Sequence, residues 1–218
     1  MSRLLFGARL SIGLALLSTI GAVVAGACLG MWAGYRGGLP DELTMRIADF
    51  LLVLPAIYVL LVLRAALPLV MPAAAVFAMM AAIFVLIAWP LVARGVRAIV
   101  LVEREREYVT AAMSLGASTS RVIGRHVLPA CRGYLLVQAT LLLPAFILAE
   151  ATLSFVGFGF SDEVATWGTM LTEASNLATI TRAPWTLAPA AAIFAVVLAA
   201  NVAVQGADST PHLSRDSR

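Results

Sequence analysis

Long runs of apolar residues dominate the chain and predict helices that cross a lipid bilayer. The first run, residues 10–33, contains no charged residue. At about 1.5 Å per residue, a helix of this length can span the hydrocarbon core with some tilt. Further apolar runs occupy residues 47–63, 73–93, 133–152 and 185–204. The pattern predicts an all-α, polytopic transmembrane domain with five apparent spans.

The composition supports a membrane protein that forms a single domain over residues 1–218. Hydrophobic residues make up 61% of the chain and charged residues 12%, whereas a soluble domain carries about 25% charged residues. Within the first run, small residues predict close helix packing, because small side chains let helices approach in lipid. These residues are Gly13, Gly21, Gly26 and Gly30.

The distribution of arginine predicts the orientation of the spans. Residues 94–132 contain seven arginines and residues 153–182 contain one. Because cytoplasmic loops carry an excess of positive charge, we expect the first segment in the cytoplasm and the second outside. The polar tail, residues 205–218, then lies in the cytoplasm, and five spans leave the N-terminus outside. One further span upstream would remove the conflict with Arg3 and Arg9, which this orientation places outside.

The segment Glu103–Pro129 predicts two short helices joined at a sharp bend. Gly116 can end the first helix in a left-handed conformation without steric cost. Ser118 is a suitable N-cap for the second helix, and Pro129 is expected to end it. Glu107, Ala111 and Leu115 follow one another at i, i+4 spacing and therefore share a helix face. Such an elbow can bring its backbone close to a groove on another protein.

A resemblance to a known family follows from the order of residues in this segment. The series Ala111-Ala112, Gly116 and Leu128-Pro129 resembles the EAA loop of bacterial ABC importer permeases. The flanks resemble the dipeptide/oligopeptide/nickel branch of that family, and the likeness covers roughly residues 3–206. The matching flanks include residues 34–38, 104–109, 147–157 and 167–171.

The resemblance implies a permease subunit of an ATP-driven importer in the bacterial plasma membrane. It implies half of a translocation pathway for short peptides, with nickel as the alternative substrate. Its implied partners are a second permease, two ATPase subunits that hydrolyse ATP, an extracytoplasmic binding protein and membrane lipid. The resemblance assigns coupling to the ATPase to Glu107, Tyr108, Ala111, Ala112, Leu115, Gly116 and Ala117.

The sequence departs from the family pattern in three places. Thr110 stands where the family commonly has the glutamate that gives the loop its name, and Glu107 could replace it from one turn earlier. The usual first span of such permeases has no counterpart, which is the upstream helix that the charge distribution also requires. The tail from Gly206 to Arg218 lacks the ending usual in this branch.

Four other residues in or beside apolar runs receive specific predictions. Glu150 in the fourth run is a candidate for a pathway or gate, since a carboxyl in a span is costly to bury. A structural role, in which it accepts hydrogen bonds, is the alternative. Asp49 is expected to pair with Arg46, one turn earlier. Trp167 and Trp185 are expected at the membrane interface.

The sequence offers no enzyme motif, cofactor site or metal site. It contains no G-x-x-x-x-G-K-[ST] phosphate loop and no His-Glu-x-x-His pair. Cys28 and Cys131 are isolated, as are His126 and His212. The arginines flank apolar runs, which indicates orientation in a membrane and no nucleic-acid partner. A secondary transporter and an inactive membrane scaffold remain as alternative functions.

Overall fold

Every regular element in the described part of the chain is helical, which confirms the predicted fold class. The structure is a computed structural model that describes residues 2–66, 68, 71–161, 163–174 and 183–208. The long helices are α1 (Ser2–Arg36), α2 (Gly38–Val53), α4 (Ala73–Glu103), α7 (Leu128–Phe155) and α10 (Ala188–Asp208). The short ones are α3 (Ala56–Ala65), α5 (Glu107–Ser114), α6 (Thr119–Val122) and α8 (Trp167–Glu173), with a π turn at Ile123–Val127 and a 3-10 turn at Pro184–Leu187.

Four helical segments are long and apolar enough to cross a membrane by themselves. They cover residues 3–36, 73–103, 119–155 and 184–202. Helices α2 and α3 together make up to a fifth span, but they meet at a bend of 90°. The bend lies at Leu54 and Pro55, which both have extended backbone. Proline disfavours helical backbone in the residue before it. The run at 47–63 is therefore divided between two helices.

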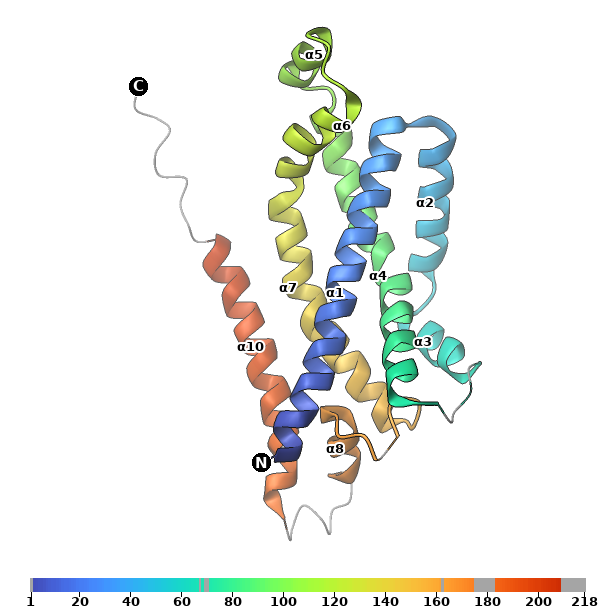
Figure 1. Ribbon diagram of the computed structural model, residues 1–218, viewed down its shortest axis with the longest axis vertical. Helices are drawn as coiled ribbons and strands as arrows, with labels where there is room; N and C mark the ends of the chain where they lie inside the picture. Colours follow the sequence, from blue (N-terminus) through green and yellow to red (C-terminus); the bar gives the residue numbers. More distant parts are fainter. Residues whose placement is uncertain (1, 67, 69–70, 162, 175–182, 209–218) are drawn as a thin grey trace.

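Helices α1 and α4 lie side by side and run in the same direction through the centre of the bundle (Figure 1). They approach so closely that a Cβ added to Gly26 would lie 2.5 Å from Cβ of Val92. A Cβ on Gly30 would lie 2.5 Å from the carbonyl oxygen of Ala93. The predicted close packing is confirmed at these glycines and at Gly21, but it is wrong for Gly13, whose surroundings are open.

The two ends of the bundle carry different elements (Figure 1). Helices α5 and α6 lie at one end, beside the turn between α1 and α2. Helices α3 and α8 lie toward the opposite end, together with the start of α1. Helix α10 runs from the α8 end toward the α5 end, and residues 209–218 of the predicted tail lie outside the described residues.

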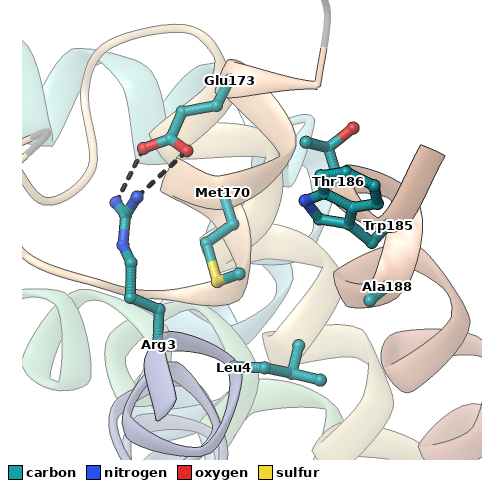
Figure 2. A pocket seen from close by; sticks show the side chains of 7 residues that line it. All are labelled: Arg3, Leu4, Met170, Glu173, Trp185, Thr186 and Ala188. Atoms are coloured by element: carbon teal, nitrogen blue, oxygen red, sulfur yellow. Dashed lines mark hydrogen bonds and ion pairs between the residues drawn. The ribbon is translucent and has the colours of Figure 1, made fainter. Parts of the chain in front are cut away.

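The α8 end is fastened to the start of α1. Trp167 is 3% exposed, and its Nε1 donates a hydrogen bond to the carbonyl oxygen of Leu4 at 3.2 Å. Its predicted place at the membrane interface is therefore wrong, because the side chain fills a helix contact. Arg3 pairs with Glu173 at 2.7 Å beside a pocket that Trp185 also lines (Figure 2). Trp185 is exposed, as an interface residue would be.

Candidate coupling site

The candidate site begins where α4 ends. Helix α4 continues to Glu103, ten residues beyond the predicted end of the apolar run at residue 93. The chain then turns at residues 104–106, and α5 starts at Glu107. Arg104 Nη1 donates a hydrogen bond to the carbonyl oxygen of Gly34 at 2.9 Å. The positive charge thus lies at the C-terminus of α1, where the helix dipole favours it.

Two side chains of α5 attach it to the bundle. Val109 is fully buried in the same hydrophobic core as Val127. The hydroxyl of Tyr108 donates a hydrogen bond to the carboxylate of Glu103. The Tyr108 ring lies 5.5 Å from that of His126, centroid to centroid, at a tilt of 47°. The hydrogen bond to Glu103 raises the pKa of the Tyr108 phenol above its ordinary value of 10.0, because it stabilises the protonated form.

The predicted bend between the two short helices is confirmed at Gly116. This residue has φ +84°, in the left-handed region. Its N–H donates to the carbonyl oxygen of Met113 at 2.9 Å, and the N–H of Ala117 donates to that of Ala112 at 3.0 Å. These two bonds form a Schellman motif, which satisfies carbonyl groups at the end of α5. Ser118 occupies the N-cap position of α6 as predicted, but its side chain makes no capping hydrogen bond.

The prediction that Pro129 ends the second helix is wrong. Helix α6, the π turn and α7 form one continuous helix over residues 119–155. In the π turn the N–H of Leu128 donates to the carbonyl oxygen of Ile123, five residues earlier. A wider turn of this kind changes the spacing of the carbonyl groups with which a proline ring collides in a regular α-helix. The elbow is therefore connected directly to a membrane-crossing helix.

The elbow presents an apolar surface to the surroundings. Leu115 is 89% exposed, Met113 51% and Tyr108 44%. Ala111 and Glu107 are also exposed, whereas Ala112 and Ala117 are half-buried. We call the set Glu107, Tyr108, Ala111, Met113, Leu115 and Gly116 the elbow surface. Exposed apolar side chains that gather in one patch mark sites of protein contact, so the elbow surface is a candidate for such a site.

The structure brings together all seven predicted coupling residues on or beside the elbow surface. Glu107 makes no ion pair with any described residue, so its carboxylate is available to a partner. Thr110 is exposed and lies one turn after Arg106, whose carbonyl oxygen it contacts at 3.4 Å. Sequence reasoning missed Met113, whose sulfur accepts a hydrogen bond from the hydroxyl of Tyr35 at 3.6 Å.

Ion pairs join α2 to α4, the helix from which the elbow continues. The guanidinium of Arg97 donates from Nη2 to Oδ2 of Asp41 at 2.6 Å and also from Nε to Oδ1. Asp49 pairs with Arg94 at 3.2 Å. The predicted pair of Asp49 with Arg46 is therefore wrong, because α2 lies against α4 and Arg46 pairs with Glu42 instead. The pairs join α2 to α4.

Glu150, the other predicted site residue, lies at the opposite end of the bundle. Its carboxyl is 0% exposed and accepts hydrogen bonds from Ser11 and Ser154, each at 2.9 Å. The N–H of Trp167 donates to the Ser11 hydroxyl at 3.1 Å. The side chain thus joins α1, α7 and α8, which supports the structural alternative for this residue.

Metal ligands are not grouped in the described part of the chain. No set of three or more histidine, cysteine, aspartate or glutamate side chains there could hold a metal ion. Cys28 is exposed and Cys131 is buried, and both are free thiols. The elbow surface itself offers exposed apolar side chains and the Glu107 carboxylate, which has no ion partner among the described residues.

Known proteins are similar to this chain in sequence and in fold. Residues 26–208 match the family described as "Binding-protein-dependent transport system inner membrane component". The chain is 37% identical to the oligopeptide transport system permease protein OppC of Bacillus subtilis (strain 168), over 83% of this chain and 57% of that protein. It is 36% identical to the di/tripeptide transport system permease protein DppC of Pseudomonas aeruginosa (strain UCBPP-PA14), over 94% of this chain and 66% of that protein.

The chain thus spans 57% and 66% of the length of these two relatives. Among solved structures, a chain of the MetNI methionine ABC transporter in inward-facing conformations has the same fold. The TM-score is 0.66 at 17% identity, and the match covers 94% of this chain and 96% of that chain.

Proposed function

The chain belongs to the family of binding-protein-dependent transport system inner membrane components, and on this premise we propose that it is one permease subunit of an ATP-driven importer of short peptides. The relatives described above are peptide permeases by name, which supports peptides over nickel as the substrate. The fold similarity to a chain of an ABC transporter supports an importer over a secondary transporter.

The single observation that carries the proposal is the elbow surface between the end of α4 and the start of the helix that continues into α7. Leu115 and Met113 expose apolar surface without lying in a membrane-crossing helix. Beside them, Glu107 offers a carboxylate with no ion partner among the described residues. We propose that this surface enters a cleft on an ATPase subunit, with Leu115 as the central apolar contact. Ala111, Ala112 and Ala117 keep the approach close because their side chains are small.

Movement of the elbow would be passed to the membrane helices through the contacts at its base. The bond between Tyr108 and Glu103 connects α5 to α4, and Val109 connects it to the core. The continuous helix 119–155 connects the other arm to α7. A force applied by an ATPase would therefore reach the helices that form this subunit's half of a pathway. A second permease would supply the other half.

The proposed assembly with ATPase subunits and a binding protein also implies an orientation of the chain in the membrane. The subunit is a multi-pass component of the inner membrane. We propose that the α5 end faces the cytoplasm, where two ATPase subunits bind, and that the α8 end faces the extracytoplasmic binding protein. The N-terminus of the chain then lies outside, and the C-terminal tail lies in the cytoplasm. ATP is hydrolysed on the partner subunits.

Uptake and labelling experiments test the proposal together. Cells that lack this gene are expected to lose uptake of labelled dipeptides and to regain it from a plasmid copy, while nickel uptake stays unchanged. In the same cells, cysteine placed at Met113 is expected to react with membrane-impermeant reagents only after the membrane is opened. Reaction of that cysteine in intact cells would rule out contact with a cytoplasmic ATPase. Loss of nickel uptake alone would exclude the peptide substrate.

A further inference from the structure

A pocket of about 500 Å³ lies between the end of α1 and the start of the continuous helix 119–155. Its lining consists of Trp32, Tyr35 and Arg36 from α1 and of Thr119 and Ile123 from the other helix. Both segments belong to stretches that the structure describes without a gap, residues 2–66 and 71–161. The two helix ends lie at the end of the bundle that carries the elbow (Figure 1). The pocket shares no residue with the elbow surface.

The end of α1 indicates the level of this pocket in the membrane. Trp32 is the next-to-last residue of the uncharged run 10–33, and Arg36 lies three residues beyond its end. At about 1.5 Å per residue, Arg36 stands about 5 Å outside the run. The headgroups of a bilayer occupy roughly the 5–7 Å outside its hydrocarbon core. Trp32 is 46% exposed, as is typical of tryptophan at this boundary.

Arginines around the pocket supply positive charge. Arg36 is exposed, and its side chain forms no ion pair with any described residue. Of the described residues that line the pocket, none is acidic. Arg121 and Arg125, on the same helix as Thr119, are exposed and also form no ion pair with a described residue. The region therefore attracts an anion and repels a group that carries an ammonium.

The lining also combines hydrogen-bond donors with apolar surface. Tyr35 and Thr119 contribute hydroxyl groups, and Trp32 and Ile123 contribute apolar wall. The Tyr35 hydroxyl donates to the sulfur of Met113 at 3.6 Å. A thioether is a weak acceptor, so a phosphate oxygen can take its place. A phospholipid presents the matching order of groups, because its charged phosphate is followed by glycerol and acyl chains.

We propose that this pocket binds the headgroup phosphate of an anionic phospholipid. The planar fork of the Arg36 guanidinium matches two phosphate oxygens, and its one charge balances the one charge of a phosphodiester. Basic pockets between membrane helices bind anionic headgroups in this way. We choose a lipid over a partner protein because the lining runs from the apolar part of α1 at Trp32 to the charged Arg36, as a lipid does. The inference goes beyond the proposed function and does not depend on the transported substrate.

The first experiment counts the lipids that the complete importer retains. The complex is purified in detergent and titrated with phosphatidylglycerol, and native mass spectrometry measures the bound lipid. At equal lipid concentration, the wild type is expected to hold one more phosphatidylglycerol per copy of this subunit than Arg36→Gln. This variant is expected to need roughly 10- to 100-fold more lipid to fill the site, as loss of a charge-assisted hydrogen bond requires. Zwitterionic phosphatidylcholine is expected to leave the site unfilled in both.

Arg121→Gln is the matched control for Arg36→Gln. It removes the same charge from an exposed residue that does not line the pocket. Its effect on the lipid concentration for half-filling is expected to stay below about twofold, because salt at 0.15 M screens an exposed charge. Arg36→Lys keeps the charge without the fork and is expected to weaken binding less than Arg36→Gln.

The second experiment adds a negative charge to the pocket. Thr119→Asp places a carboxylate in the lining beside Arg36, so it is expected to weaken phosphatidylglycerol binding at least as much as Arg36→Gln. Ser120→Asp adds the same charge at the next residue, which is exposed and does not line the pocket. It is expected to leave binding within about twofold of wild type. Both changes lie in the first turn of helix 119–155, where the helix dipole favours aspartate, so both variants are expected to fold.

Four outcomes would overturn the inference. Equal binding of phosphatidylglycerol by the wild type and Arg36→Gln would show that the pocket holds no lipid. Equal losses from Arg36→Gln and Arg121→Gln would indicate a general attraction of anions by this end. Equal binding of phosphatidylcholine would remove the selectivity for anionic lipid. Displacement of phosphatidylglycerol by an equal concentration of inorganic phosphate would show a site for a free anion. Peptide uptake enters none of these measurements, so they decide the inference whatever the substrate is.

Discussion

Arg97 of α4 holds the carboxylate of Asp41, at the start of α2, with two hydrogen bonds from one guanidinium. The contact fastens α2 along α4 close to the point where the elbow leaves the bundle. Both side chains are partly shielded from solvent, unlike those of the exposed pair Arg46 and Glu42 within α2. Two pairs of the same charge type therefore differ in burial and in the number of helices they join.

A double-mutant cycle on Asp41→Asn and Arg97→Gln is expected to give an interaction energy of about 0.5–3 kcal/mol, as for residues in direct contact. The same cycle on Glu42→Gln and Arg46→Gln is expected to give about 0.3–0.5 kcal/mol, as for exposed i,i+4 pairs. The free energy of unfolding in detergent micelles is the measurement. Equal interaction energies for the two pairs would show that α2 is not fastened through Asp41.

Replacement of Gly116 tests the left-handed bend of the elbow. A Cβ added to Gly116 would meet no atom within 4 Å, so the change acts through the backbone alone. Gly116→Ala is expected to cost about 1–2 kcal/mol in the local conformation, the penalty of a left-handed residue with a side chain. We expect less ATPase subunit to co-purify with this variant.

Gly133→Ala is the matched control for Gly116→Ala. Its added Cβ also meets no atom within 4 Å, but Gly133 lies in α7 and has no positive φ. Alanine in a helix is more favourable than glycine by about 0.8–1 kcal/mol. This variant is expected to bind the ATPase as the wild type does. Equal losses from both variants would place the cause outside the bend.

Leu115→Ser tests the contact made by the elbow surface. Because Leu115 is almost fully exposed, its truncation is expected to leave the free energy of unfolding within about 0.5 kcal/mol of wild type. As a central interface residue it is expected to weaken ATPase binding by about 2 kcal/mol or more. Val102→Ser is the control, because Val102 is an exposed residue of α4 that does not belong to the elbow surface. Stronger weakening by Val102→Ser would move the contact away from Leu115.

The membrane helices and the elbow could be predicted because their signals are local. Apolar runs mark bilayer crossings through their length, and Gly116 marks a bend because few other residues adopt its backbone. The predicted second apolar run starts at residue 47, because Asp41 and Arg46 interrupt the hydropathy before it, whereas α2 already starts at Gly38. In this added part of the helix, Asp41 contacts its charge partner Arg97 on α4.

Two of the remaining errors have a tertiary origin. The sequence placed Asp49 next to Arg46 by spacing, but its partner Arg94 lies on α4, directly after the apolar run at 73–93. Pro129 ends a regular helix by local rules, yet the π turn before it lets the helix continue. Tryptophan is typical of the membrane interface, but Trp167 is buried because α8 packs against α1. The contacts of Asp49 and Trp167 join segments far apart in the sequence, whereas the π turn lies directly before Pro129.

Gly30→Ala tests the close contact between α1 and α4. The added Cβ would lie 2.5 Å from the carbonyl oxygen of Ala93, an atom of the backbone that cannot rotate away. The helices must separate, at an expected cost of about 1–3 kcal/mol. Gly13→Ala on the same helix meets open space, so it is expected to keep the gain of about 0.8–1 kcal/mol that alanine has over glycine in a helix. Equal stability of the two variants would show that α1 can move away from α4 without cost.

Substitutions of Glu150 distinguish a structural carboxyl from a pathway or gate residue. Glu150→Leu leaves the hydroxyl groups of Ser11 and Ser154 without their acceptor in a buried site, at an expected cost of about 1–3 kcal/mol. Glu150→Gln has the same shape and keeps one acceptor oxygen, so we expect it to lose less stability than Glu150→Leu. We expect its peptide uptake to fall only in proportion to the amount of folded protein. The measurements are the midpoint of thermal unfolding and the rate of peptide uptake per folded complex. Because the carboxyl is fully enclosed by α1, α7 and α8, a stable Glu150→Gln variant that assembles with its partners but transports nothing would contradict the structural role. It would require the site to open during transport and place Glu150 in the pathway.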